Sequence, residues 1–368
     1  MSAFGIAPET YDWSPKFEKP SPQKEHSSCV AEIPFERIQL HDVRRQAAVQ
    51  SLGPAILSGL EAEDRESPSL LLWNDRGLSL FDAVLESPDY YLAAREWLVL
   101  RENIERIVST ISSGDRLIEL GAGNMKKTAL ILNALQLQNK LIQYIACDVD
   151  RTSLKRCISD IQTMFPSSTS CIKIQGLLGT YEDCTVWLKN NKGKGHTSLM
   201  WLGNSMANFT PKEASEYIRG FLSTGSSMIV ALDGCHDQEQ IARAYEGPSN
   251  REFLLNGLPH ANELLGAEVF NINHWGFRGQ WNPELWMHES FYVAERDLSV
   301  NICGKKFDFR KGEKMRSIRS GKWPKPKVMD ICREAGGKVM ECWMNSEESY
   351  GMSANIIFLL IYDLIDIH

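Results

Sequence analysis

A short segment of the chain, LIELGAGNMKKT (residues 117–128), has residue types and spacing that could hold a nucleotide-like ligand. A strand-like apolar run gives way to Gly121 and Gly123 and then to a helix-like stretch. A strand, a glycine turn and a helix in this order place backbone N–H groups near a ligand. A dinucleotide-binding motif would have a third glycine three residues after Gly123. That position is Lys126, and Lys127 follows, so the segment departs from the dinucleotide pattern.

Two acidic residues near this loop favour S-adenosylmethionine as the ligand. Glu119 stands in the order E-L-G-A-G, a common opening of methyltransferases, and Asp148 ends the next predicted strand. A carboxylate at that place can accept hydrogen bonds from both hydroxyls of a ribose. Dehydrogenases that bind NAD use such an acid too, so Asp148 alone does not separate the two classes. A dehydrogenase and an unoccupied α/β turn stay open as alternatives to methyl transfer.

Helices and strands must alternate to position these residues. The apolar spacing predicts strands at residues 116–120, 142–147, 197–202 and 227–232, and helices at residues 96–111, 126–136, 152–164 and 211–222. The last helix begins with Thr210-Pro211-Lys212-Glu213, which fits a capping box with proline at the first helical position. This alternation indicates an α/β fold with a mostly parallel sheet, and ligands bind such sheets at the carboxyl ends of the strands.

The rest of the chain predicts a second domain. Residues 31–95 and 238–322 do not continue the alternation and contain stretches rich in aromatic and amide side chains. We expect them to form a discontinuous, lid-like substrate-binding domain. Residues 96–237 and 323–368 then form the Rossmann-like domain. Residues 1–30 are rich in Pro, Ser, Glu and Lys and predict a flexible leader.

Composition limits the compartment and the partners. The 368-residue chain is 43% hydrophobic and 24% charged, as in soluble globular proteins, and its net charge of −7 argues against bulk nucleic-acid binding. The nine cysteines form no CxxC pair, which indicates reduced thiols in a cytoplasmic protein. The eight histidines form no HxxxH pair, so we expect no metal. The apolar tail at residues 355–365 is too short to span a membrane and predicts a buried strand.

A series of ordered motifs resembles the histidine-betaine (ergothioneine-pathway) methyltransferase family, and within it the fungal branch that includes the 4-dimethylallyltryptophan N-methyltransferases. The motifs are LFDAVLESPDYY (80–91), LIELGAGNMKKT (117–128), ACDVD (146–150), GTYED (179–183), WLGNSMANFTP (201–211), ALDGCHD (231–237), ARAYEG (242–247), FLLNGLPHANELLG (253–266) and GEKMRSIRSGKW (312–323). The resemblance runs from about residue 65 to the C-terminus. It implies a Rossmann-like class I methyltransferase sheet, S-adenosylmethionine as cofactor, and a role in secondary metabolism of the alkaloid type.

The resemblance also assigns contacts to the cofactor. These are expected at Gly121, Gly123, Lys127, Asp148, Thr180, Tyr181 and Gly203. Lys127 would lie near the carboxylate of the methionine moiety, with a solvated lysine as the alternative. Bacterial members often have Asp-Phe in place of the Thr180-Tyr181 pair. Because Thr180 has no charged acceptor for the adenine amine, we expect the backbone to make that contact.

The family's substrates are free amino acids that are methylated on the α-amine. The resemblance assigns substrate contacts to Tyr90, Asn208, Tyr245 and Ser320, and the first three are also the catalytic candidates. Hydroxyl and amide groups can hold a zwitterion because they donate and accept. The alternatives are a hydrogen-bonded core tyrosine and a loop-capping amide. Direct displacement needs mainly positioning, and the sequence identifies no proton acceptor, although water or a tyrosine could relay the proton.

Two pocket positions bear on the choice of amino acid. Histidine-specific members read R-T-E-x-S where this chain has Arg316 to Ser320, so Ile318 replaces the glutamate that bonds the imidazole. Trp73 stands where the bacterial enzymes usually have tyrosine. Loss of a charged partner disfavours the imidazole by about 1–3 kcal/mol. We therefore expect an aromatic amino acid: tryptophan first, a prenylated tryptophan second, tyrosine third and histidine last.

Two other classes of protein are alternatives to this prediction. Residues 305–327 are rich in lysine and arginine, as in a nucleic-acid methyltransferase. Because Asp308 and Glu313 interrupt the run and the rest of the chain is acidic, we expect a solvated hairpin face and no nucleic-acid partner. A non-catalytic, cofactor-binding regulator is the other alternative. The number of methyl groups transferred and the oligomeric state, a monomer included, stay open.

Overall fold

A computed structural model describes most of the chain. The described residues are 38–45, 52–123, 125–166 and 169–344, with the backbone alone of 356–361. The contacts from Ile38 to His368 form one compact unit. The flexible leader predicted at residues 1–30 lies outside the described residues.

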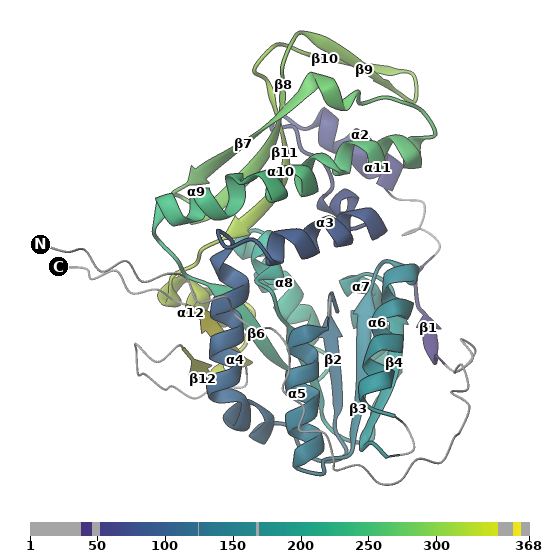
Figure 1. Cartoon of the computed structure of the whole chain (residues 1–368), viewed down its shortest axis with the longest axis vertical. Helices are drawn as coiled ribbons and strands as arrows, with labels where there is room; N and C mark the ends of the chain where they lie inside the picture. The colour runs from purple at the N-terminus through teal and green to yellow at the C-terminus, as the bar shows by residue number, and fades with distance from the viewer. Residues whose placement is uncertain (1–37, 46–51, 124, 167–168, 345–355, 362–368) are drawn as a thin grey trace, which may run out of the picture. The chain divides into compact units, whose positions relative to one another are not determined.

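Eight parallel strands form the main sheet (Figure 1). Their order across the sheet is β1 (Leu40–Asp42), β4 (Ile172–Leu178), β3 (Ile142–Asp148), β2 (Arg116–Leu120), β5 (Thr197–Trp201), β6 (Ser227–Asp233), β13 (Ile356–Ile361) and β12 (Val339–Trp343). All neighbours pair in parallel. The order reverses between β2 and β5, and α/β sheets bind ligands beside such a reversal. The predicted α/β class and parallel sheet are confirmed.

Helices cover both faces of the sheet (Figure 1). One face carries α4 (Tyr91–Ser109), α5 (Lys126–Leu137) and α6 (Arg151–Met164), and the other carries α7 (Tyr181–Asn190), α8 (Pro211–Leu222) and α12 (Lys325–Glu334). Leu117 and Ile118 are consecutive in β2 but belong to the two different cores, because side chains alternate across a strand. The predicted capping box of Thr210 and Glu213 begins α8.

Three strands of the sheet, β1, β4 and β12, were not individually predicted from the sequence. In β4 the polar residues Lys173 and Gln175 and the interior Gly176 weaken the strand pattern. Packing explains this glycine, because a Cβ at Gly176 would lie 2.5 Å from the Ile158 side chain and 2.6 Å from that of Leu40. The close approach of α6 and β1 to β4 therefore requires a residue without a side chain.

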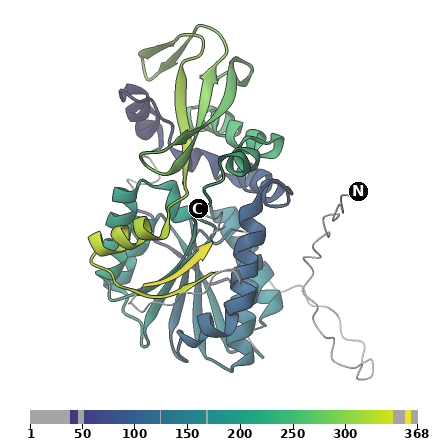
Figure 2. The same ribbon diagram turned by 90° about the vertical axis from the view of Figure 1, so that its left-hand side faces the viewer.

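The segments that do not continue the alternation are nevertheless regular. They form α2 (Leu52–Glu61), η2 (Ser69–Leu72), α3 (Asp75–Leu85), α9 (Gln238–Glu246), α10 (Pro248–Leu255), α11 (Gly257–Leu265), η4 (Ile272–His274), β7 (Trp275–Asn282), β8 (Met287–Ala294), β9 (Leu298–Ile302), β10 (Lys305–Phe309) and β11 (Lys314–Gly321). The strands make two small sheets, β7–β8–β11 and β9–β10, which are antiparallel. These elements lie above the carboxyl ends of the parallel strands (Figures 1 and 2).

The division of the chain into two domains stays a prediction. Residues 31–95 were assigned to the substrate-binding domain, yet Leu40–Asp42 from this segment forms the edge strand beside β4. Residue 95 lies inside α4. A boundary drawn in sequence therefore crosses elements that pack with the main sheet. Segments on both sides of it contribute to the cavity described next.

Candidate active site

A cavity of about 650 Å³ lies between the strand ends and the elements above them. Every residue predicted for the site lines this cavity: Trp73, Tyr90, Gly121, Gly123, Lys127, Asp148, Thr180, Tyr181, Gly203, Asn208, Tyr245, Ile318 and Ser320. They come from segments up to 247 positions apart in the chain (73 to 320). The structure thus brings the predicted cofactor and substrate residues together, while the role of each stays a prediction.

Glycines shape the side of the cavity next to the sheet. Gly121 follows β2 and Gly203 follows β5, and both have φ of +73°, a left-handed conformation that favours glycine. A Cβ at Gly121 would lie 3.3 Å from the Tyr181 hydroxyl, and one at Gly203 would lie 3.5 Å from Lys127 Nζ. The two turns therefore keep the backbone open at the reversal of strand order.

Glu96, which was not predicted from the sequence, organises this side of the cavity. Glu96 is 2% exposed. It accepts hydrogen bonds from Lys127 Nζ at 2.6 Å and from the Gly203 N–H at 2.8 Å. Lys127 is therefore not the solvated lysine weighed as an alternative. One feature of the sequence could have indicated Glu96: it is a charged residue on an apolar helix face, three positions before Val99.

Two carboxyl groups in the cavity wall have raised pKa values. Burial raises the pKa of Glu119 to about 7, against hydrogen bonds from Thr128 Oγ1 and Tyr144 Oη, both at 2.6 Å. Burial also raises the pKa of Asp148, although the backbone N–H groups of the next residues donate to it. Glu119 therefore changes charge near neutral pH, and its charge would affect the binding of a cationic ligand.

Aromatic residues line the cavity near the start of α7. The Tyr181 ring lies 4.8 Å from that of Trp201 and 6.2 Å from that of Phe209, centroid to centroid. Phe209 and Tyr217 also line the cavity, and the sequence analysis had not singled them out. The Thr180 hydroxyl is engaged in a capping box with Asp183. The Thr180 N–H also donates to Asp183, and the Thr180 carbonyl accepts from the Cys184 N–H, so a ligand contact through the backbone of Thr180 stays a prediction.

The opposite side of the cavity is an aromatic wall. The ring of Trp73 lies 5.2 Å from that of Phe81 and 5.1 Å from that of Phe253, and these two rings are 5.1 Å apart. Ile318 packs against the same apolar cluster. Trp73 and Ile318 were predicted, whereas Phe81 and Phe253 were missed, although both lie in motifs that carry the resemblance. Their side chains meet only because α3 packs on α10.

Polar groups adjoin this wall, because Tyr90 and Tyr245 pack in the same cluster as Phe81 and Phe253. The rings of Tyr90 and Tyr245 are 5.8 Å apart, and the Tyr245 hydroxyl lies 2.8 Å from Ser320 Oγ. Burial raises the pKa of both tyrosines, so their hydroxyls stay protonated near neutral pH. Asn208 ends η3 (Ser205–Asn208), and its side chain makes no hydrogen bond to any residue in the described ranges. The tyrosines are suited to donate hydrogen bonds, and the Asn208 amide is available to a ligand.

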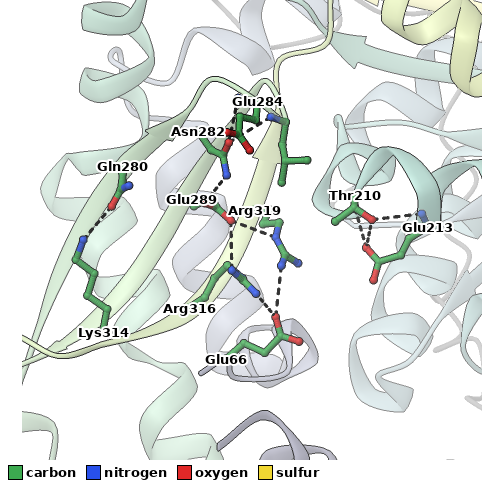
Figure 3. A network of polar contacts seen from close by, with 11 residues as sticks. Glu66, Thr210, Glu213, Gln280, Asn282, Glu284, Glu289, Lys314, Arg316 and Arg319 are labelled. Carbon is green, nitrogen blue, oxygen red and sulfur yellow. Dashed lines mark hydrogen bonds and ion pairs between the residues drawn. The ribbon is translucent and has the colours of Figure 1, made fainter. Parts of the chain in front are cut away.

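A network of two arginines and two glutamates holds the wall together (Figure 3). Arg316 pairs with Glu66 at 2.6 Å and with Glu289 at 3.4 Å. Arg319 pairs with the same two carboxylates at 3.5 and 3.3 Å. Between the arginines, β11 has a register shift that leaves Ser317 unpaired, and such bulges change the direction of side chains. The network ties the segment before Trp73 to β8 and β11.

The basic segment at residues 305–327 is only partly the solvated face that the sequence predicted. Lys305 and Lys306 are exposed on β10. Arg316 and Arg319, in contrast, are paired inside the protein, and Lys322 is fully buried at 0% exposed. The prediction is therefore wrong for these three residues. These three residues form ion pairs with carboxylates from distant segments, and such pairs cannot be recognised from residue spacing along the chain.

In the described ranges, no three His, Cys, Asp or Glu side chains are grouped as a metal ion would require. Within the same part of the chain, no helix combines the length and apolarity needed to cross a membrane.

Comparisons with known proteins identify similar sequences. The model of a family described as "Histidine-specific methyltransferase, SAM-dependent" matches residues 52–355. The chain is 62% identical to N-methyltransferase fsqC of Aspergillus fumigatus over 96% of both chains. It is 44% identical to N-methyltransferase imqF of Aspergillus flavus over 97% of this chain and 96% of that one. It is 27% identical to 4-dimethylallyltryptophan N-methyltransferase easF of Aspergillus fumigatus over 82% of this chain and 92% of that one.

Proposed function

Because this chain belongs to the family of S-adenosylmethionine-dependent, histidine-specific methyltransferases, we propose that it methylates the α-amine of a free aromatic amino acid, with tryptophan as the leading candidate. The predicted family and cofactor are confirmed, and the chain is an S-adenosylmethionine-dependent N-methyltransferase. The dehydrogenase alternative is thereby excluded. The acceptor and the site residues are the proposal.

The residues on the sheet side of the cavity fit the cofactor. Gly121 and Gly203 leave room for it, since a side chain there would approach Tyr181 or Lys127. Asp148 ends β3, where a carboxylate suits the ribose hydroxyls. Lys127 would face the cofactor's carboxylate, with its position fixed by Glu96. When bound, S-adenosylmethionine supplies a methyl group on a positively charged sulfur. The protein residues hold it and exclude water.

The polar residues on the other side support an amino acid as acceptor. Tyr90, Tyr245 and Ser320 offer hydroxyls, and Asn208 offers an amide that makes no other hydrogen bond in the described part of the chain. Such neutral groups can hold a carboxylate and orient an amine. In a direct displacement, most of the rate enhancement comes from positioning the reacting groups. Because Tyr90 and Tyr245 have raised pKa values, they act in this scheme as donors and not as phenolate bases.

One observation carries the choice of side chain. The cavity wall consists of Trp73, Phe81 and Phe253 in mutual contact, with Ile318 packed against the same cluster in place of a carboxylate. An indole can pack on this surface by offset or edge-to-face contacts. An imidazole would lose its ion-paired partner there. This wall supports tryptophan over histidine, with a prenylated tryptophan second and tyrosine third.

The decisive experiment is a panel of free amino acids. Purified protein and S-adenosylmethionine are incubated with tryptophan, 4-dimethylallyltryptophan, tyrosine and histidine, and products are read by mass spectrometry. We expect methylation of the α-nitrogen with the highest kcat/KM for tryptophan. A highest value for histidine would overturn the choice of substrate class. Turnover of DNA or RNA, with no amino acid methylated, would overturn the proposal as a whole.

A substitution in the wall sharpens this test. Ile318→Glu should shift the ratio of kcat/KM values toward histidine, because the new carboxylate accepts from the imidazole and is desolvated beside an indole. Trp73→Tyr should strengthen the shift. Ile272→Glu is the matched control, since Ile272 is 38% exposed and does not line the cavity. A ratio that Ile318→Glu leaves unchanged in a folded protein would contradict the role of this wall.

A further inference from the structure

A fully buried lysine lies behind the proposed substrate clamp. The Lys322 side chain is 0% exposed and directly follows β11. Its Nζ lies 2.7 Å from Asp233 Oδ2, 2.8 Å from Tyr245 Oη and 3.2 Å from Ser320 Oγ. An ammonium group has three N–H donors and no acceptor. These three partners therefore use all the donors of Lys322, and both hydroxyls must accept from it.

Asp233 fixes the lysine in place. It ends β6, is 1% exposed, and accepts from the Tyr91 hydroxyl at 2.5 Å and from the Cys235 N–H at 3.0 Å. An isolated buried charge is costly, whereas a buried pair with its remaining hydrogen bonds satisfied is tolerated. The ion pair joins the last residue of β6 in the main sheet to the residue after β11 in the smaller sheet.

A second donor fills the remaining acceptor site of Ser320. Asn204 Nδ2 lies 3.2 Å from Ser320 Oγ. The orientation of this amide is defined, because Asn204 Oδ1 accepts the Asp233 N–H at 2.9 Å and must therefore be the oxygen. Ser320 Oγ thus accepts from Lys322 and from Asn204, and a hydroxyl has only two acceptor lone pairs. The short contact between Ser320 and Tyr245 must then have the serine as donor.

The direction of the Tyr245 hydroxyl follows from these contacts. Its oxygen accepts from Lys322 and from Ser320, so its own hydrogen must point away from both. The Tyr90 hydroxyl, which also lines the cavity, interacts with that of Tyr245 when no substrate is bound. We propose that Lys322, held by Asp233, is a positioning residue that makes Tyr245 a hydrogen-bond donor to the substrate. The inference rests on the proposed function, because it takes the bound amino acid as the acceptor of this hydrogen.

The charge around Tyr245 supports a donor and opposes a phenolate. Burial and the Asp233 carboxylate together raise the pKa of Tyr245 above its usual value, so the hydrogen is retained. In the absence of Lys322, the Tyr245 hydroxyl would be free to turn toward Ser320, and the substrate would meet a lone pair instead of a hydrogen. A carboxylate of the amino acid would be repelled by that lone pair.

A double-mutant cycle tests the proposal. Lys322→Met, Tyr245→Phe and the combined variant are compared for KM of the amino acid, kcat, and the dissociation constant of S-adenosylmethionine. We expect Lys322→Met to raise KM roughly 10- to 100-fold, as for loss of a hydrogen bond to a charged group. Cofactor affinity should change by less than about twofold. In the Tyr245→Phe background, Lys322→Met should have little further effect, because there is no hydroxyl left to orient.

Controls separate positioning from a loss of structure. Lys322→Met leaves Asp233 unpaired, so the charge-neutral pair Lys322→Gln with Asp233→Asn is measured in the same cycle. Lys306→Met removes an exposed lysine and should change none of these constants. Equal losses in the wild-type and Tyr245→Phe backgrounds, or a parallel loss of cofactor affinity, would overturn the role of Lys322 while the proposed function stands. A wild-type protein that methylates no amino acid would instead overturn the proposed function, and this inference with it.

Discussion

The two sides of the cavity are built in different ways. On the sheet side, Asp148 ends a strand of the parallel sheet, and Gly121 and Gly203 lie one and two residues after the ends of two others. On the other side, Trp73, Tyr245 and Ile318 come from a short helix end, a longer helix and an antiparallel strand far apart in sequence. One side is thus set by local strand–turn segments, and the other by tertiary packing.

This difference predicts on which side of the cavity the protein tolerates amino-acid substitutions. A turn at a strand end has little freedom, since a left-handed glycine or an acid at the ribose position has few substitutes. The aromatic wall depends on contacts held by the Arg316, Arg319, Glu66 and Glu289 network, and a single replacement such as Ile318 alters its chemistry. We therefore expect substitutions on the sheet side to abolish cofactor binding, and those on the other side to change the preferred amino acid.

The largest effect is expected at a sheet-side glycine. Gly121→Val forces a β-branched residue into φ of +73° and places its Cβ 3.3 Å from the Tyr181 hydroxyl. We expect the affinity for S-adenosylmethionine, measured by calorimetry, to fall by about 100-fold or more, since strain and lost contacts add. Gly266→Val is the matched control, because Gly266 has φ of +65° with nothing within 4 Å of an added Cβ. Equal weakening by both variants would show that backbone strain alone is responsible.

A smaller and more selective effect is expected at the clamp. Asn208→Ala and Tyr245→Phe should lower kcat/KM for the amino acid by roughly 10- to 100-fold, because each removes one hydrogen bond to a charged substrate. Cofactor affinity should stay nearly constant, since both residues are proposed to contact the amino acid and not the cofactor. Steady-state kinetics and calorimetry check the two parts. Full activity of either variant at low substrate concentration would remove that residue from the clamp.

The ion network should affect stability more than chemistry. Glu289 is 6% exposed and pairs with both Arg316 and Arg319. Glu289→Gln leaves two nearby guanidinium groups with one shared carboxylate, so we expect the free energy of unfolding to fall by about 1–3 kcal/mol in denaturant titrations. KM for the amino acid should rise a few-fold, with cofactor affinity unchanged. Lys314→Gln, which breaks an exposed contact between Lys314 of β11 and Gln280 of β7, is the control.

The smallest predicted effect depends on pH. Burial raises the pKa of Glu119 from 4.5 to about 7. Between these values the folded protein binds the proton and the unfolded chain does not, so ligand-free stability should fall as pH rises from about 4.5 to 7. Cofactor affinity should rise over pH 6 to 7.5, by several-fold, because the ionised carboxylate attracts a cationic ligand. Calorimetry at several pH values should show this rise in the wild type and a flatter profile in Glu119→Gln.

Most residues on the sheet side of the cavity could be predicted from the sequence, with Glu96 as the exception. The glycine turn after β2, Asp148 at the end of β3 and the capping box at Thr210 were all predicted, and the structure has them at the expected positions. Each depends on residues within one strand, turn or helix start. Hydrophobic periodicity and capping chemistry act over a few residues and can therefore be recognised without the fold.

Contacts between residues far apart in sequence could be identified only in the tertiary structure. Glu96 pairs with Lys127, 31 positions further along the chain. Asp233 pairs with Lys322 over 89 positions. The ring of Phe81 packs on that of Phe253 over 172 positions. Strand β4 was missed for the same reason, since Gly176 is explained by Leu40 and Ile158 packing on it. Burial of a charge and fit of a side chain depend on what the rest of the chain places beside them, and a local pattern does not encode those neighbours.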